Sequence, residues 1–233
     1  MIPYDVILAD PPWSYNDRNT NGNRGACCKY DLLTDAQLAA LDVPGLAAPD
    51  AVMMMWATCP RLPAALVLMQ AWGFDYVTVA FTWVKTGSLD APRRRFLAAL
   101  DPIGADLAER GNLSGATARA TLRDVWDRVS GLVQPTISFG LGRHTRSNAE
   151  LVLLGRRGAG LRPVSRSVRQ VVMAPRGAHS AKPDEVQARI ETLYGDDVRR
   201  LEMFARRRRP GWDAFGNEIE GSIDIEQRAH FGC

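Results

Sequence analysis

The four residues Asp10-Pro11-Pro12-Trp13 directly follow a short apolar run, Val6 to Ala9. An apolar, β-branched run bounded by prolines predicts a strand, and ligands of open α/β sheets bind at the carboxyl ends of strands. Asp10 would present a carboxylate there, beside the carbonyl groups of two prolines, which have a fixed φ and no backbone N–H. A lone Asp-Pro-Pro indicates only a strand that ends at a proline turn, with the aromatic residue in the core. The complete tetrad at a strand end favours a site.

This combination suits the methylation of an exocyclic amine. The N(6) lone pair of adenine is delocalised into the ring, so an enzyme must hold both amino hydrogens and turn the lone pair toward the methyl donor. A carboxylate accepts one hydrogen and a backbone carbonyl the other, while an adjacent Trp offers a face for a flipped base. The carboxylate also stabilises the charge developing on nitrogen, by roughly a few kcal/mol in a dry site. We therefore expect catalytic roles for Asp10, Pro11, Pro12 and Trp13.

Alternating strand and helix patterns must position this tetrad. Apolar runs bounded by turn residues predict the strands, and capping residues with apolar stripes predict the helices. Alternation of the two predicts a mixed, mostly parallel α/β sheet covered on both faces, with part of it antiparallel. The predicted strands are Val6 to Ala9, Val52 to Ala57, Tyr76 to Val84, Leu151 to Leu154, Gln170 to Met173 and Leu201 to Phe204. The predicted helices are Thr34 to Leu41, Leu62 to Trp72 and Pro183 to Tyr194.

Residues 88–135 interrupt this alternation. The segment contains no strand pattern, and Leu122, Val125, Trp126, Val129 and Leu132 fall on one helical face. We interpret it as a helical insertion between two strands of the sheet, with a possible role in target recognition. Residues 105–122 also resemble a helix-turn-helix, although the same pattern is common in plain helical hairpins.

Composition places the chain among ordinary globular proteins. It has 233 residues, of which 24% are charged and 46% hydrophobic. These values exclude a disordered, collagen-like or coiled-coil protein and suit one domain spanning 1–233. No window approaches the roughly 18 to 20 apolar residues of a membrane span, and we expect a cytoplasmic protein. Cys27, Cys28, Cys59 and Cys233 lack metal-ligand spacing, so we expect free thiols and no metal.

The charge is unevenly distributed along the chain. Residues 1–60 hold three basic and seven acidic side chains, whereas 156–209 hold fourteen basic and six acidic ones. This asymmetry suggests a polyanionic partner at one part of the fold. Three of the 29 basic residues are lysine, which a GC-rich genome explains as well as selection for guanidinium chemistry does. Charge alone therefore leaves nucleic acid and a solvated face equally supported.

Three blocks in this order carry a family resemblance. They are Asp10-Pro11-Pro12-Trp13, then His179-Ser180-Ala181-Lys182-Pro183-Asp184-Glu185, then Leu201-Glu202-Met203-Phe204-Ala205-Arg206 with Gly211-Trp212-Asp213-Ala214-Phe215-Gly216-Asn217-Glu218. The chain, except for 88–135, resembles the MT-A family of S-adenosylmethionine-dependent adenine-N(6) methyltransferases. That family includes the catalytic subunit of the eukaryotic mRNA adenosine enzyme and its bacterial and phage relatives.

The resemblance implies a Rossmann-like class I methyltransferase fold with its motifs in permuted order and S-adenosylmethionine as cofactor. A carboxylate and a carboxamide suit the ribose diol, and an arginine fork suits the cofactor's carboxylate. Where some relatives have His-Asn after the first arginine, this chain has Arg208-Arg209, which could instead hold substrate phosphates. The cofactor residues implied are Asp10, Lys182, Arg206, Arg208, Arg209, Asn217 and Glu218.

Further residues resemble family positions near the acceptor base. Tyr30 follows the tetrad, Lys85 ends a predicted strand, and Glu150 opens another after a basic loop that contains Arg143 and Arg146. Each also has a structural interpretation, as a loop aromatic, a strand-end lysine or a strand-edge carboxylate. The substrate-binding residues implied are Tyr30, Lys85, Arg143, Arg146 and Glu150.

The resemblance favours an enzyme that flips adenine out of DNA and methylates its N(6) amine, because compact bacterial and phage members mostly act on DNA. RNA is an alternative substrate. A catalytically inactive partner subunit is a second alternative, against which the intact tetrad argues. A DNA-binding regulator is a third, and it requires a true helix-turn-helix in 88–135. The sequence does not decide between a monomer and a homodimer.

Overall fold

The computed structural model describes residues 2–13, 33–111, 114–130, 137–140, 144–177, 181–217 and 219–220. The chain divides into two compact units. The first unit comprises Met1–Val84, Ala149–Met173 and Gly177–Cys233, and the second comprises Lys85–Asn148 with Ala174–Arg176. Each unit is considered by itself.

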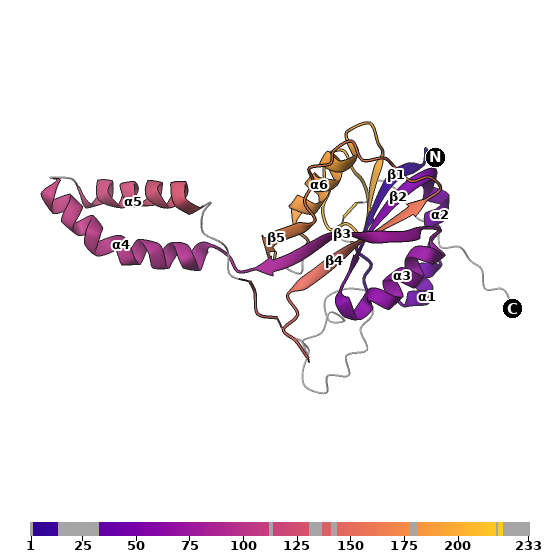
Figure 1. Cartoon of the computed structure of the whole chain (residues 1–233), viewed down its shortest axis with the longest axis horizontal. Coiled ribbons are helices and arrows are strands. Elements are labelled where there is room, and N and C mark those ends of the chain that lie inside the picture. Colours follow the sequence, from indigo (N-terminus) through magenta and orange to yellow (C-terminus); the bar gives the residue numbers. More distant parts are fainter. Residues whose placement is uncertain are drawn as a thin grey trace. The chain divides into compact units, whose positions relative to one another are not determined.

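A seven-stranded mixed sheet organises the fold (Figure 1). Its order is β5-β3-β4-β2-β1-β6-β7. β1 is parallel to β2 and β6, and β6 is parallel to β7, whereas β4 is antiparallel to both β2 and β3. The expected mixed α/β sheet is confirmed, antiparallel part included. The strands are β1 (Tyr4–Ala9), β2 (Ala47–Ala57), β3 (Asp75–Thr86), β4 (Ala149–Arg157), β5 (Val171–Pro175), β6 (Arg200–Met203) and β7 (Asp213–Phe215).

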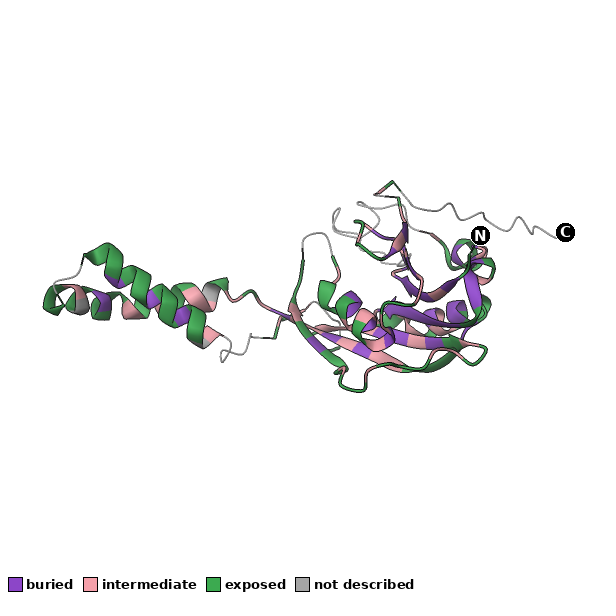
Figure 2. Ribbon diagram, turned by 90° about the horizontal axis from the view of Figure 1, so that it is seen from above, coloured by how far each residue is buried: buried purple, intermediate pink, exposed green. Residues whose placement is uncertain are grey.

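The central strands are buried on both faces, which explains their continuous apolar sequences. Side chains alternate between the faces of a strand, so successive residues of β1 point to opposite sides of the sheet. Ile7 and Met53 belong to the hydrophobic cluster that also contains Leu38 of α1 (Asp35–Ala39). Leu8 and Trp56 line a pocket together with residues of α6 (Asp184–Tyr194). Buried residues accordingly concentrate in these strands (Figure 2).

The helices begin where the sequence predicts. Thr34 caps α1 through the expected capping box, in which its hydroxyl accepts from the backbone N–H of Gln37. α6 follows Pro183 and ends at Gly195, whose φ of 72° is in the left-handed region that glycine favours. The remaining helices of the first unit are α2 (Val43–Leu46), the 3₁₀ turn η2 (Cys59–Arg61) and α3 (Leu62–Ala71).

The second unit contains the helical insertion, as α4 (Asp90–Arg110) and α5 (Gly115–Val129) between β3 and β4. The rings of Phe96 and Trp126 meet with their centroids 5.2 Å apart, and Leu122 is buried. Val125 was expected on the same buried face, but it is exposed, because the buried stripe follows the i, i+4 series Ala118, Leu122 and Trp126, and Val125 lies one position before Trp126, about 100° around the helix. Leu132 lies outside the described residues.

Two strand predictions need correction. Phe204 was expected in a strand, but β6 ends at Met203, and Phe204 has a φ of 63°, which turns the chain away from the strand direction. β7 was not predicted, because its three residues, Asp213–Phe215, are too short for a period-two pattern.

Candidate active site

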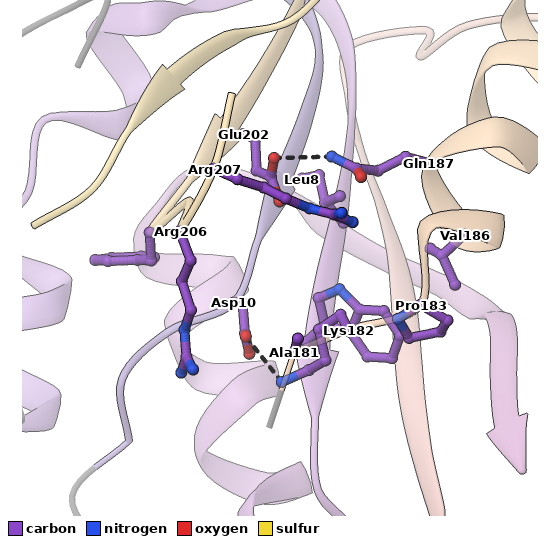
Figure 3. Close-up of a pocket in the computed structure, with 12 residues that line it drawn as sticks. Leu8, Asp10, Ala181, Lys182, Pro183, Val186, Gln187, Glu202, Arg206 and Arg207 are labelled. Carbon is purple, nitrogen blue, oxygen red and sulfur yellow. Dashed lines mark hydrogen bonds and ion pairs between the residues drawn. The ribbon is translucent and has the colours of Figure 1, made fainter. Parts of the chain in front are cut away.

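Asp10 lies at the carboxyl end of β1, where the backbone N–H of Asp10 donates to the carbonyl of Met203 on the neighbouring chain segment (3.3 Å). Its Oδ2 accepts a hydrogen bond from Lys182 Nζ at 2.8 Å. The two residues are 172 positions apart in sequence. Both line a pocket at the start of α6 (Figure 3), so the structure joins the first and second sequence blocks in one site.

Lys182 is the cation at the centre of this site. Its Nζ lies 3.5 Å from Glu150 Oε2 and 5.3 Å from the ring centroid of Trp56. Burial lowers the pKa of Lys182, but the nearby Asp10 and Glu150 carboxylates outweigh burial and hold that pKa above its usual value. The Lys182 ammonium therefore pairs with two carboxylates, Asp10 directly after β1 and Glu150 on β4.

The carbonyl oxygens of Pro11 and Pro12 each accept one backbone hydrogen bond. Pro11 O accepts from the N–H of Trp13 at 2.8 Å, and Pro12 O accepts from the N–H of Leu33 at 3.3 Å. A carbonyl oxygen has two lone pairs, so each retains the capacity to accept an amine proton.

Trp13 lies in the hydrophobic core with a side chain only 5% exposed. The guanidinium carbon of Arg61 is 4.9 Å from its ring centroid. We expected an open face for stacking of a base, and in this structure Arg61 and the core cover the ring. The aromatic residues Trp56 and Phe204 line the pocket, and Trp56 also contacts Trp83 edge to face with the ring centroids 6.0 Å apart.

Glu202 is a second carboxyl group in the pocket, and sequence reasoning did not assign it a role. It lies on β6 in register with Leu8 of β1, and its Oε2 accepts from Gln187 Nε2 of α6 at 2.8 Å. Burial, with the nearby Asp10 carboxylate, raises the pKa of Glu202 to about 7. A lone acidic residue inside the apolar run 201–204 was the available signal.

The arginines after β6 have different surroundings. Arg206 lines the pocket, as does Arg207, which pairs with Asp184. Arg208 donates to the carbonyl of Glu220 at 3.0 Å through its Nε. Arg209 donates from Nε and one terminal nitrogen to the two oxygens of Glu191, at 2.7 and 2.8 Å, and these bonds hold the pKa of Glu191 below its usual value. The structure thus brings Arg206 to the pocket and engages Arg208 and Arg209 elsewhere.

Other predicted residues are placed outside this pocket or are not described. Asn217 is exposed. In the second unit, the backbone of Lys85 donates to Asn148 O and accepts from Ser138 N–H, both at 2.8 Å. The guanidinium of Arg146 lies 4.8 Å from the ring centroid of Phe139. Tyr30, Arg143 and Glu218 lie outside the described residues, so their predicted roles stay predictions.

The donor chemistry of the pocket fits the methionine end of S-adenosylmethionine. That part of the cofactor carries an ammonium, a carboxylate and a sulfonium, and the pocket combines two carboxyl groups, Asp10 and Glu202, with the cations Lys182, Arg206 and Arg207. Across the described parts of the chain, no group of three metal-ligating side chains comes together, and no helix has the length and apolar character needed to cross a membrane. Within the same parts, Cys59 is a free, exposed thiol.

Comparisons with known proteins cover nearly the whole chain. The MT-A70 family model matches residues 4–98 and 119–218. The type II methyltransferase M.MunI of a Mycoplasma species is 30% identical over 95% of this chain and 81% of that protein. Human N(6)-adenine-specific methyltransferase METTL4 is 26% identical over 93% of this chain and 37% of its own length. The N6-methyladenosine RNA methyltransferase MTA1 of Cryphonectria parasitica is 22% identical over 93% of this chain and 52% of its own length.

Replacing Glu202 by Gln should stabilise the protein increasingly as pH rises. The unfolded carboxyl group, with its ordinary pKa of 4.5, releases its proton before the native one, whose pKa is about 7. Wild-type stability therefore falls between these values, and the advantage of Glu202→Gln should grow from near zero at pH 4.5 to at most about 3 kcal/mol at pH 8.

Chemical denaturation of both proteins at intervals from pH 4.5 to 8 measures this difference. Glu185→Gln provides the matched control, because Glu185 is an exposed residue of α6 that pairs with Arg189. A pH-independent difference between wild type and Glu202→Gln would contradict the raised pKa.

Proposed function

The chain belongs to the MT-A70 family, and we propose that this adenine-specific N(6) methyltransferase transfers the methyl group of S-adenosylmethionine to adenine in DNA. The observation that carries the proposal is the Asp10 carboxylate, fixed by Lys182 in a pocket at the end of β1. Within a stacked duplex the N(6) amine is out of reach of such a recessed carboxylate, so the target adenine has to be flipped out.

The cofactor, when bound, supplies an electrophilic methyl group. Asp10 accepts one hydrogen of the adenine amine, and the carbonyl of Pro11 or Pro12 accepts the other. Holding both hydrogens directs the nitrogen lone pair out of the plane of the base. The S–CH₃ bond would break as the N–C bond forms, and S-adenosylhomocysteine would leave as a neutral thioether. The Asp10 carboxylate would stabilise the positive charge on the nitrogen and take the proton that is lost.

Lys182 acts here as a positioning residue. It holds one oxygen of Asp10 at 2.8 Å, and a carboxylate has enough lone pairs to accept an amine hydrogen at the same time. Glu150, whose Oε2 lies 3.5 Å from the same ammonium, would accept a hydrogen bond from the bound base.

DNA is favoured over RNA by the family resemblance of compact bacterial and phage members. M.MunI, named as a type II methyltransferase, is matched over 81% of its length, whereas the RNA methyltransferase MTA1 is matched over 52%. The basic segment 156–209 suits the phosphate backbone of either nucleic acid.

Asp10→Asn should lower kcat for methyl transfer at least about 100-fold, because the amide cannot take the proton and carries no charge to stabilise the transition state. Transfer of labelled methyl from S-adenosylmethionine to matched DNA and RNA oligonucleotides, single- and double-stranded, measures this loss and the substrate preference. Asp197→Asn is the control, since Asp197 is an exposed loop residue. Equal rates for Asp10→Asn and wild type on every substrate would overturn the catalytic assignment, and a better rate with RNA would overturn the choice of DNA.

We also propose that the insertion 88–135 recognises the target. Its exposed arginines include Arg94 and Arg95 on α4. Deletion of residues 88–135 should weaken duplex binding while methyl transfer to a short free oligonucleotide persists, as fluorescence anisotropy and the transfer assay would measure. Unchanged duplex affinity after the deletion would exclude this role.

A further inference from the structure

Glu202 is a half-buried carboxyl group to which the proposed chemistry assigns no role. It comes from β6, the parallel neighbour of β1, at the register position of Leu8, which also lines the pocket. Figure 3 shows the Glu202–Gln187 pair and the Asp10–Lys182 pair at opposite ends of this pocket. Glu202 therefore faces the same pocket as the carboxylate assigned to the adenine amine, but from a different strand.

The charged groups around Glu202 already have other partners. Lys182 pairs with Asp10, Arg207 with Asp184, and Arg209 with Glu191. Arg206, which also lines the pocket, lies close enough to influence Lys182 electrostatically. Among the residues that the structure describes, the hydrogen-bond partner of Glu202 is the neutral amide of Gln187.

A half-buried carboxyl group that accepts a hydrogen bond from an amide and lines a pocket is suited to an incoming cation. The pocket takes the methionine end of the cofactor under the proposed function, and that end carries one ammonium group. We infer that Glu202 binds the α-ammonium group of S-adenosylmethionine, with Gln187 as the residue that orients it; this inference rests on the proposed function. Asp10 is then left to the adenine amine, and Arg206 to the cofactor's carboxylate.

The protonation of Glu202 follows from the same geometry. Burial and the Asp10 carboxylate favour the neutral form, the hydrogen bond from Gln187 and the charge of Arg209 oppose them, and the pKa of Glu202 is raised to about 7. An ammonium group needs the ionised carboxylate. Binding of the cofactor should therefore release the carboxyl proton to solvent, and affinity should increase as pH rises through 7.

Isothermal titration calorimetry with S-adenosylhomocysteine tests the inference without catalysis. This product keeps the ammonium group and lacks the sulfonium charge, and its deaminated analogue lacks both. Wild type should bind S-adenosylhomocysteine about tenfold more tightly at pH 8 than at pH 6. Glu202→Gln should weaken that binding about 10- to 100-fold at pH 8, should abolish the pH dependence, and should leave affinity for the deaminated analogue unchanged. Glu185→Gln, which changes an exposed carboxyl group of the same helix as Gln187, should behave as wild type.

The results separate this inference from the proposed function. If Glu202→Gln bound S-adenosylhomocysteine as tightly as wild type does, the assignment of Glu202 to the ammonium group would fail, and the proposed function would stand. If Glu202→Gln lowered the affinity for both ligands equally, the assignment would also fail, because the effect of the carboxyl group would then not depend on the ammonium group of the ligand. If wild type bound neither ligand, both the inference and the proposed use of S-adenosylmethionine would fail.

Discussion

The ion pair between Lys182 and Asp10 is the interaction on which the site depends. An ammonium group removed from water is costly unless carboxylates surround it, and here Asp10 at 2.8 Å and Glu150 at 3.5 Å provide that environment. The hydrogen bond from Lys182 holds the Asp10 carboxylate in one orientation at the carboxyl end of β1. Truncating Lys182 would remove the cation that both carboxylates share, and truncating Asp10 would leave Lys182 with Glu150 alone.

The sheet and the segment before α6 bring the two residues of this ion pair together. β1 lies between two parallel neighbours, β2 and β6, and its carboxyl end delivers Asp10. The turn that precedes α6 delivers Lys182, and Pro183 fixes the backbone directly before the helix. β6 adds Glu202 from the adjacent position. Three segments that are distant in sequence thus place charged groups around one pocket, which is the usual location of ligand sites in open α/β sheets.

Much of the fold could be predicted because burial leaves a clear record in sequence. β1 and β2 are buried on both faces and read as continuous apolar runs, and the Thr34 capping box marks the start of α1. β7 left no such record, because three residues cannot display a period. The exposure of Val125 depends on how α5 rotates against α4, which the apolar spacing of its sequence did not determine.

The site could be predicted in part for a related reason. The motif identified Asp10, and the resemblance identified Lys182 and Glu150. The contact between Asp10 and Lys182 depends on the fold, because the two residues are 172 positions apart in sequence. Trp13 fits both a core position and a stacking role by sequence, and the packing of Arg61 decides for the core in this structure. The partner of Arg209 is Glu191, which no local pattern connects to it. The sequence did not predict a role for Glu202, because a single acidic residue in a strand is equally typical of an exposed position at a sheet edge.

A crystal structure of the protein with S-adenosylhomocysteine and an adenine-containing oligonucleotide tests the account most directly. The account predicts that the flipped adenine places its N(6) about 2.7 to 3.2 Å from an Asp10 carboxylate oxygen and from the carbonyl of Pro11 or Pro12, with Lys182 still bonded to Asp10. An adenine amine bound elsewhere, with Asp10 contacting only Lys182, would contradict it.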